Sequence, residues 1–234
     1  MPADDFVFPP APQTSLAVQG TDARFPMRRI FCVGRNYEAH AREMGKDPTR
    51  EAPFFFTKPA DAALDTPCTI PYPPQTEDLH HEIELVIAIG KGGRNIAETD
   101  VMDHVWGASV GIDLTRRDLQ AEAKKAGRPW DWGKAFDNSA PIAALKPIAD
   151  VPSVEQGRIW LAVNGEVRQD ADLADLIWSV REHVAILSQS MALAPGDIIM
   201  TGTPAGVAAL VEGDVVTGGV DGIATLEVTI GPRA

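Results

Sequence analysis

The most unusual chemical feature of the sequence is a pair of glutamates, Glu82 and Glu84, in an otherwise apolar segment. Residues 82–90 are rich in β-branched side chains and end in glycine, which predicts a strand. Side chains alternate between the faces of a strand, so both carboxylates point the same way, with Cβ atoms roughly 6.5–7 Å apart. Half-buried carboxylates placed in this way repel each other unless one is protonated or a cation lies between them. A solvated strand end is the alternative interpretation.

A third carboxylate, Asp113, ends the strand expected over residues 104–113 and precedes an expected helix. Side chains at such strand ends often converge on a site, although an aspartate there could equally cap the helix. The three carboxylates together would form an all-oxygen ligand set, which suits Mg²⁺, Mn²⁺ or Ca²⁺ and poorly suits zinc. His80 and His81 are adjacent and so point to opposite faces, which argues against a shared role as zinc ligands.

A possible general base lies in the short helix expected over residues 37–44. His40 and Glu43 are three residues apart and therefore share one face of that helix. A carboxylate that orients an imidazole commonly produces a base that can activate water. A surface ion pair on a solvated helix is the alternative.

Cationic and hydroxyl side chains could complete such a site. Arg117, Gln120 and Lys124 follow one stripe of the helix expected over 115–126, and Lys134 lies among aromatic residues. A lysine in that setting can simply bury its stem, but near a metal-bound substrate it could stabilise an oxyanion. The loop 200–207 is rich in glycine and threonine, lacks the ending of a phosphate-binding loop, and suits a carboxylate.

Composition limits the classes of function. With 234 residues and 44% hydrophobic content, the chain can bury a large core as one domain. A net charge of −12 argues against nucleic-acid binding but permits a small anionic substrate if local cations line its site. No apolar run approaches the roughly 18 residues that a membrane span needs. Two cysteines without a disulfide framework indicate a reducing compartment, and we expect a cytoplasmic protein.

The elements that must position these residues are mostly strands. Residues 1–27 are expected to form an irregular or short-strand lead-in, followed by one catalytic domain over 28–234. Further strands are expected at 28–34, at 52–59, in a hairpin around Asn164-Gly165 and in three glycine-separated segments after residue 195. Asn36 is expected to cap the first helix, and the longest helix is expected over 172–193. Strands and helices do not alternate regularly, which favours an α+β fold on a bent, partly antiparallel sheet.

The order of these signals resembles the fumarylacetoacetate hydrolase family over about residues 28–230. The matching segments are CVGRNYEAHAREMG, FFFTKPADA, HHEIELVIAIG, GIDLTRRDLQAEAKKAGRPW, GKAFD, LAVNGEVRQ and PGDIIMTGTPAGV. The first three are most similar to the members that hydrolyse fumarylpyruvate in gentisate-type degradation of aromatic compounds. Trp132 and Gly133, before Lys134, depart from the pattern, as does the segment after Val207.

The resemblance implies a mixed β-sheet roll with a few short helices and one longer helix, a homodimer, and a Mg²⁺ or Mn²⁺ ion. It implies metal ligation by Glu82, Glu84 and Asp113, and activation of water by His40 with Glu43. Lys134 is the implied catalytic cation. The implied substrate-binding residues are Arg117, Gln120, Thr203, Arg35, Tyr37 and Lys58.

The resemblance also implies the reaction, which is metal-dependent hydrolysis of a carbon–carbon bond in an acylpyruvate. For fumarylpyruvate, the products would be fumarate and pyruvate, and Arg35 or Lys58 would bind the distal carboxylate. Oxaloacetate decarboxylation and isomerisation of a hydroxydienoate are alternatives within the family. A non-catalytic, metal-stabilised binding module is an alternative of another class, although a structural metal needs no base such as His40 beside it.

Overall fold

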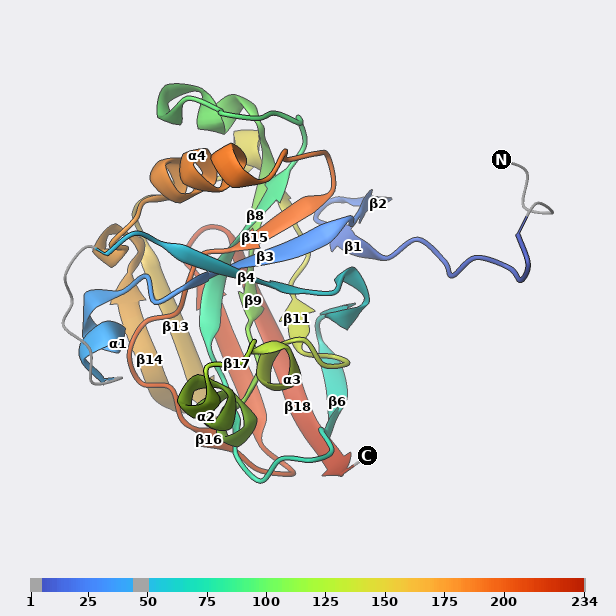
Figure 1. Cartoon of the computed structure of the whole chain (residues 1–234), viewed down its shortest axis with the longest axis vertical. Coiled ribbons are helices and arrows are strands. Elements are labelled where there is room, and N and C mark those ends of the chain that lie inside the picture. Colours follow the sequence, from blue (N-terminus) through green and yellow to red (C-terminus); the bar gives the residue numbers. More distant parts are fainter. Residues whose placement is uncertain (1–5, 44–50, 234) are drawn as a thin grey trace.

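The computed structural model describes residues 6–43 and 51–233, apart from the side chains of residues 41 and 43. Two large sheets dominate the fold (Figure 1). The eight-stranded sheet has the order β4 (Phe54–Lys58), β3 (Arg29–Gly34), β15 (Asp197–Met200), β8 (Ile83–Ile89), β9 (Val105–Ile112), β11 (Ala140–Ile142) and β5 (Ala63–Asp65), with β12 (Lys146–Pro147) paired to β9. The five-stranded sheet has the order β14 (Glu166–Asp172), β13 (Arg158–Val163), β17 (Val215–Val220), β18 (Ala224–Arg233) and β6 (Cys68–Tyr72).

Smaller elements complete the described part of the chain. A three-stranded sheet contains β10 (Thr115–Arg116), β7 (Leu79–His80) and β16 (Ala209–Leu210), and a hairpin contains β1 (Ser15–Val18) and β2 (Thr21–Pro26). The α-helices are α1 (Glu38–Glu43), α2 (Arg117–Ala126), α3 (Asp131–Lys134) and α4 (Val180–Ser190). Short 3₁₀ turns occur at Ala60–Ala62, Glu98–Asp103, Ile148–Asp150 and Leu173–Asp175. None of the helices in the described ranges is long and apolar enough to cross a membrane.

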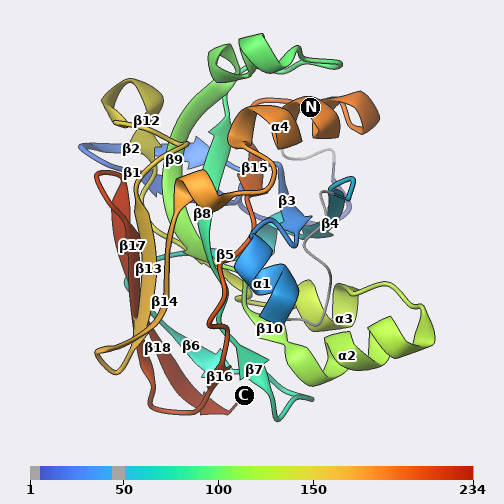
Figure 2. The same cartoon turned by 90° about the vertical axis from the view of Figure 1, so that its left-hand side faces the viewer.

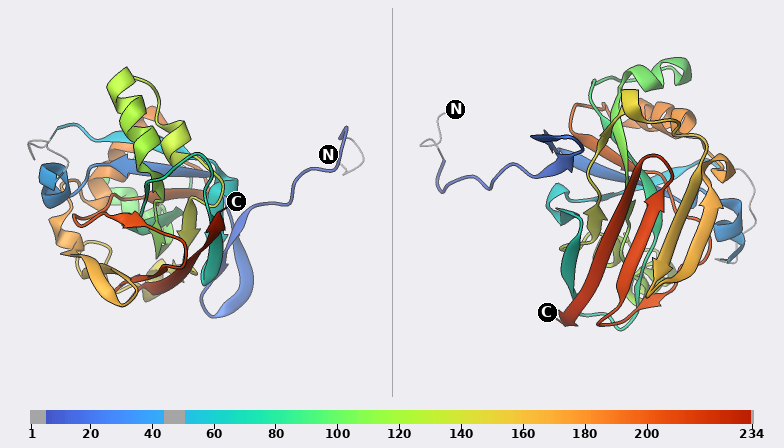
Figure 3. Two further views of the ribbon diagram at one scale, coloured as in Figure 1. Left: turned by 90° about the horizontal axis from the view of Figure 1, so that it is seen from below. Right: turned by 180° about the vertical axis from the view of Figure 1, so that it is seen from behind.

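The mixed sheets with few helices confirm the expected α+β fold. Most neighbouring strands are antiparallel, but three pairs are parallel, namely β3 with β15, β5 with β11, and β6 with β18. The five-stranded sheet forms one continuous layer, seen from behind in Figure 3, and the chain from residue 6 towards β1 approaches the body of the molecule from outside it. Figure 2 shows this layer on one side of the eight-stranded sheet, with α1, α2 and α3 on the other side.

The main core lies between the two large sheets. In β8, Leu85 and Ile87 belong to this core, whereas Val86 belongs to a second cluster that the hairpin β1–β2 covers. Alternation along the strand therefore places Glu82 and Glu84 on the face of Val86, away from the main core. Both glutamates thus face the side of the sheet on which α1, α2 and α3 lie.

The helix predicted over residues 172–193 is shorter than expected. Strand β14 continues to Asp172, whose side chain caps the 3₁₀ turn Leu173–Asp175, and α4 begins only after Ser179. Between them the backbone is extended, and the Ile177 N–H donates a 2.8 Å hydrogen bond to the Asn36 carbonyl. The apolar spacing of Leu176 and Ile177 therefore came from a packed extended segment and not from a helix.

Asn36 does not cap α1 through its side chain. Its Nδ2 donates to the carbonyls of Trp178 and Thr201, at 2.9 and 2.8 Å, and its Oδ1 accepts from the Trp178 N–H at 2.8 Å. The amide thereby joins the start of α1 to the segment before α4 and to the end of β15. A buried amide with backbone partners on two other segments fixes their relative positions more firmly than a cap would.

Acid should weaken the fold through His183, a buried residue of α4. Its Nδ1 lies 3.4 Å from the Trp178 carbonyl, its Nε2 has no hydrogen-bond partner in the described part of the chain, and burial lowers the pKa of His183 to about 4. The unfolded chain binds this proton near pH 6.5, so the stabilising contribution is complete above that pH and is lost as pH falls towards 4. The expected loss is on the order of 3 kcal/mol.

Chemical denaturation at several pH values between 7 and 4.5 measures this loss. His183→Leu should flatten the dependence of the unfolding free energy on pH, whereas His104→Leu, at a partly exposed site, should leave the dependence unchanged. Equal slopes for the wild type and His183→Leu would rule out the role of His183.

Candidate active site

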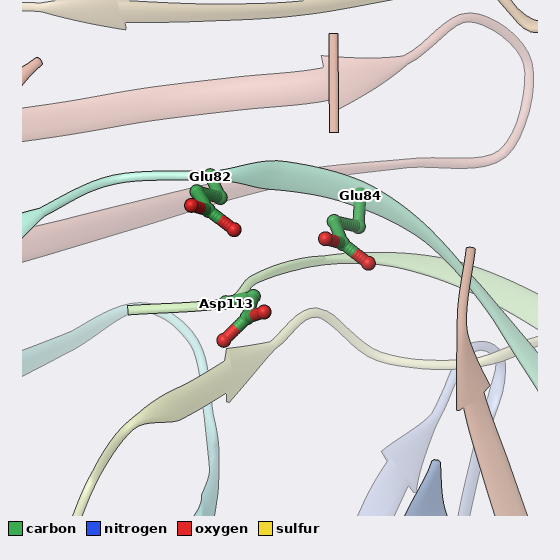
Figure 4. A group of neighbouring side chains, drawn as sticks. All are labelled: Glu82, Glu84 and Asp113. Carbon is green, nitrogen blue, oxygen red and sulfur yellow. The ribbon is translucent and has the colours of Figure 1, made fainter. Parts of the chain in front are cut away.

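Strand pairing brings the three carboxylates together. Strands β8 and β9 are antiparallel, with Ile83 opposite Ile112, and the Asp113 N–H donates a 2.8 Å hydrogen bond to the Glu82 carbonyl. Asp113 therefore lies across from Glu82, and Glu84 follows on the same face. Figure 4 shows the three carboxylates gathered between these strand ends. One oxygen from each lies within 4.8 Å of the others.

All three carboxylates are buried, so their charges are not solvated by water. Burial raises the pKa of Glu84 well above its usual value, and the negative charges of Asp113 and Glu82 raise it further. Glu84 Oε2 accepts a 2.8 Å hydrogen bond from the Gly202 N–H, from the loop after β15. Burial acts in the same direction on Glu82, but the charges of Lys134 and Arg117 outweigh it and lower the pKa of that residue.

Three cationic side chains pair with two of the carboxylates, Glu82 and Asp113. Lys134 Nζ lies 2.7 Å from Glu82 Oε2 and 2.6 Å from Asp113 Oδ2. Arg117 pairs with Glu82, and Lys58 Nζ lies 2.8 Å from Asp113 Oδ1 without the geometry of a hydrogen bond. Although burial lowers the pKa of Lys134, Asp113 and Glu82 raise it more, so its ammonium group stays protonated.

The donor set fits a divalent cation. It consists of buried carboxylate oxygens only, which are the ligands that Mg²⁺ and Mn²⁺ prefer. The Lys134 ammonium between Glu82 and Asp113 demonstrates that this point attracts positive charge. Glu84, which pairs with no cation among the described residues and has a raised pKa, would be the ligand most relieved by a metal ion. The three carboxylates can therefore hold a divalent metal.

Asp113 does not cap helix α2, which removes the alternative interpretation of that residue. The helix begins at Arg117, its N-cap position is Arg116, and no side chain caps it. The backbone of Thr115 and Arg116 pairs instead with β7. Arg117 Nη1 donates a 2.8 Å hydrogen bond to Gln120 Oε1, so the first turn of α2 presents both side chains to the carboxylates.

His40 is buried in α1 and lies close enough to Glu82 for its charge to lower the pKa of that carboxyl. Position 43 lies one helical turn further along α1, on the same face. The Glu43 side chain is outside the described part of the structure, so its pairing with His40 stays a prediction.

Most of the predicted site residues line one cavity. Its lining includes Glu82, Glu84, Asp113, His40, Arg117, Gln120, Lys134, Thr203 and Arg35. Tyr37 is buried and lines a separate cavity of about 600 Å³. Thr203 is held in place because its hydroxyl accepts a 2.8 Å hydrogen bond from Gln169.

Lys58 lies behind this cavity and not in its lining. The side chain is fully buried, and Nζ donates to the carbonyls of Leu114, at 3.1 Å, and Lys134. With Asp113 beside it, the ammonium group has no direction left for a ligand. The geometry therefore favours Lys58 as a residue that positions Asp113 and Lys134, in place of the substrate contact expected from the sequence.

Sequence reasoning did not single out Gln169, at the end of the predicted hairpin. Its Oε1 accepts from the Ile83 N–H at 3.1 Å and pairs with His81 Nδ1 at 2.9 Å. Its Nε2 donates to Thr203 and to the Pro204 carbonyl, both at 2.8 Å. Gln169 thereby links the start of β8 to the loop after β15. The only indication of this role in the sequence was a polar side chain at the end of the predicted hairpin.

The two unusual residues before Lys134 lie outside the cavity. The Trp132 side chain is 74% exposed and points away from the carboxylates. At Gly133, an added Cβ would lie 2.9 Å from the Gln120 backbone nitrogen. Glycine is therefore required for α3 to pack against α2, which places Lys134 beside Gln120.

Buried oxygen ligands with a neighbouring histidine, in a mixed β roll, define a metal-dependent enzyme. The family description Fumarylacetoacetate (FAA) hydrolase C-terminal matches residues 29–231, and the chain belongs to this family. A fumarylpyruvate hydrolase from Ralstonia sp is 45% identical over 186 residues, which cover 80% of this chain and 96% of that protein.

Two further relatives place the chain within the family. The structure of fumarylpyruvate hydrolase from Pseudomonas aeruginosa, in complex with Mn²⁺ and pyruvate, is 50% identical with a TM-score of 0.95. The alignment covers 98% of this chain and 100% of that one. The mitochondrial oxaloacetate tautomerase FAHD1 of Bos taurus is 39% identical, with coverage of 86% and 90%.

Removing one carboxylate charge should weaken metal binding. We expect Glu82→Gln and Glu84→Gln each to raise the Kd for Mn²⁺ at least tenfold, since changes in residues that only support metal ligands already cost about 10–100-fold. Titration calorimetry on chelator-treated protein measures the effect. The control is Glu77→Gln, because the exposed Glu77 pairs only with Arg233, at 2.6 Å, among the described residues. Wild-type affinity in both active-site variants would refute the ligand set.

Proposed function

We propose that this chain is a divalent-metal-dependent acylpyruvate hydrolase that converts fumarylpyruvate and water into fumarate and pyruvate. The observation that carries the proposal is the buried group of Glu82, Glu84 and Asp113 with His40 in the same cavity. The similarity to fumarylpyruvate hydrolases supports the choice of acyl group. The setting that we propose is a cytoplasmic homodimer that acts in gentisate-type degradation of aromatic compounds.

A Mg²⁺ or Mn²⁺ ion bound by the three carboxylates would supply Lewis-acid stabilisation of negative charge on the keto-acid oxygens. The pyruvate bound to the Pseudomonas aeruginosa protein is the corresponding product fragment. In this chain, Arg117, Gln120 and Thr203 line the cavity beside the carboxylates and would bind the carboxylate of the pyruvyl end. Arg117 also pairs with Glu82, so the same side chain orients a metal ligand and a substrate group.

His40 is the proposed base. It would take a proton from water while the water oxygen bonds to the carbonyl carbon of the fumaryl end. Glu43, one turn along α1, would hold the imidazole in orientation. Lys134, protonated and buried, would donate a hydrogen bond to the oxyanion that forms at that carbonyl. The bond to the pyruvyl methylene carbon then breaks, and the proton from water ends on that carbon, which becomes the methyl group of pyruvate.

Tautomerisation of oxaloacetate is the second candidate reaction, because the FAHD1 relatives are named oxaloacetate tautomerases. A keto–enol exchange needs the same charge stabilisation but breaks no carbon–carbon bond. Purified protein with Mn²⁺ should be assayed on fumarylpyruvate, acetylpyruvate and oxaloacetate, with enol absorbance and the amount of pyruvate followed together. Stoichiometric pyruvate from fumarylpyruvate supports the proposal. Loss of enol absorbance from oxaloacetate, without pyruvate from either acylpyruvate, would refute it in favour of the tautomerase.

The role of His40 has a direct test. His40→Ala should lower kcat on fumarylpyruvate by roughly 10²–10⁴, the usual range for loss of an acid–base group, with Mn²⁺ affinity close to that of the wild type. His104→Ala is the matched control, because that imidazole bonds to the Lys91 carbonyl, at 2.8 Å, far from the cavity lining. Loss of Mn²⁺ binding in His40→Ala would instead identify His40 as a ligand or a structural residue.

A further inference from the structure

Three aromatic rings form one wall of the active-site region. Phe54 and Phe56 lie on β4, and both contact Trp130, which precedes α3. The ring centroids of Phe54 and Trp130 are 5.3 Å apart in an edge-to-face arrangement, and those of Phe56 and Trp130 are 5.8 Å apart. Phe56 and Trp130 also line the cavity that contains the carboxylates. We call Phe54, Phe56 and Trp130 the aromatic wall.

One cationic group lies over each ring of the aromatic wall. Lys134 Nζ lies 5.1 Å from the Phe56 centroid, Lys124 Nζ lies 4.9 Å from the Trp130 centroid, and the Arg35 guanidinium lies 5.2 Å from the Phe54 centroid. A ring face attracts a cation through its quadrupole and carries no net charge. The wall therefore fixes the positions of three positive charges without neutralising them.

The three cations differ in their anionic partners. Lys134 pairs with Glu82 and Asp113, so its charge is compensated by two of the carboxylates. Within the described ranges, Lys124 forms no ion pair, and its ammonium group lies over the Trp130 ring. Among the same residues, Arg35 has a single carboxylate nearby, that of Glu51, at 3.8 Å on a side chain that is 71% exposed. Such a pair is long and solvent-screened, so Arg35 and Lys124 both remain able to bind an anion.

Several further observations mark these two residues as an anion site. Both line the same cavity as the carboxylates and Thr203. Partial burial and the charge of Arg117 lower the pKa of Lys124 to about 8. An anion bound beside Lys124 would raise this pKa again. Arg35 has a backbone φ of 52°, an uncommon value for a residue other than glycine and one that clusters at ligand-binding positions. In a chain of net charge −12, two cations whose ion pairs among the described residues are limited to the exposed Glu51 favour an anionic ligand.

We propose that Arg35 and Lys124, held on the aromatic wall, bind the distal carboxylate of the substrate and select diacidic over neutral acylpyruvates. This inference rests on the proposed function, which places a pyruvyl group at Arg117 and Thr203 and leaves the fumaryl carboxylate to extend along the wall. Lys58, the other cation expected for this role, is excluded by its buried contacts with Asp113 and two carbonyls. Lys124 therefore replaces Lys58 as the second candidate for this role.

The test compares two substrates that differ at the far end. Fumarylpyruvate carries a carboxylate there, and acetylpyruvate carries a methyl group. Arg35→Met and Lys124→Met should each raise KM for fumarylpyruvate about 10–100-fold more than KM for acetylpyruvate, the range for loss of one charge-assisted hydrogen bond. Lys125→Met is the matched control, since the neighbouring exposed lysine on α2 does not line the cavity. It should leave both KM values at the wild-type level.

The outcomes separate this inference from the proposed function. If the wild type cleaves fumarylpyruvate but both variants raise the two KM values equally, the distal subsite is refuted and the hydrolase activity stands. If the wild type cleaves neither acylpyruvate, the proposed function fails, and calorimetric titration of the Mn²⁺-loaded protein with fumarate decides on the anion site. At least tenfold weaker fumarate binding in Arg35→Met and Lys124→Met, but not in Lys125→Met, would support the site, and equal binding would refute it.

Discussion

Mutual repulsion among three buried carboxylates is the constraint on which the rest of the structure depends. Glu82, Glu84 and Asp113 have oxygen atoms within 4.8 Å of one another and almost no contact with water. Removing such charges from water costs several kcal/mol for each ion unless they are compensated. The fold compensates Glu82 and Asp113 with Lys58, Lys134 and Arg117, each from a different element. Glu84 instead accepts a hydrogen bond from the Gly202 N–H, and its pKa is raised well above the usual value.

Much of the surrounding architecture serves to hold this cluster in place. The pairing of β8 with β9 fixes Asp113 opposite Glu82, and the turn after β15 brings the Gly202 N–H to Glu84. Gln169 joins the start of β8 to the Thr203 loop through hydrogen bonds at both ends of its side chain. Because these supports come from both large sheets, the position of each carboxylate depends on the whole roll and not on one loop.

Local patterns in the sequence were sufficient for the longer strands and for the convergence of the three carboxylates. Alternation in residues 82–89 places both glutamates on one face, and the strand predicted over 104–113 brings Asp113 to the same edge. The helix predicted over 172–193 failed because periodicity alone does not distinguish a packed extended segment from a helix, and capping by Asp172 and Ser179 decided the outcome. The roles of Lys58 and Gln169 depend on partners 56 and 86 residues away, which spacing does not reveal.

The cationic side chains also determine what a bound ion would have to compete with. Lys134 lies between Glu82 and Asp113, and Lys58 and Arg117 contact the remaining oxygens of these two carboxylates. A divalent ion held by Glu82, Glu84 and Asp113 would therefore compete with Lys134 for the same carboxylate oxygens.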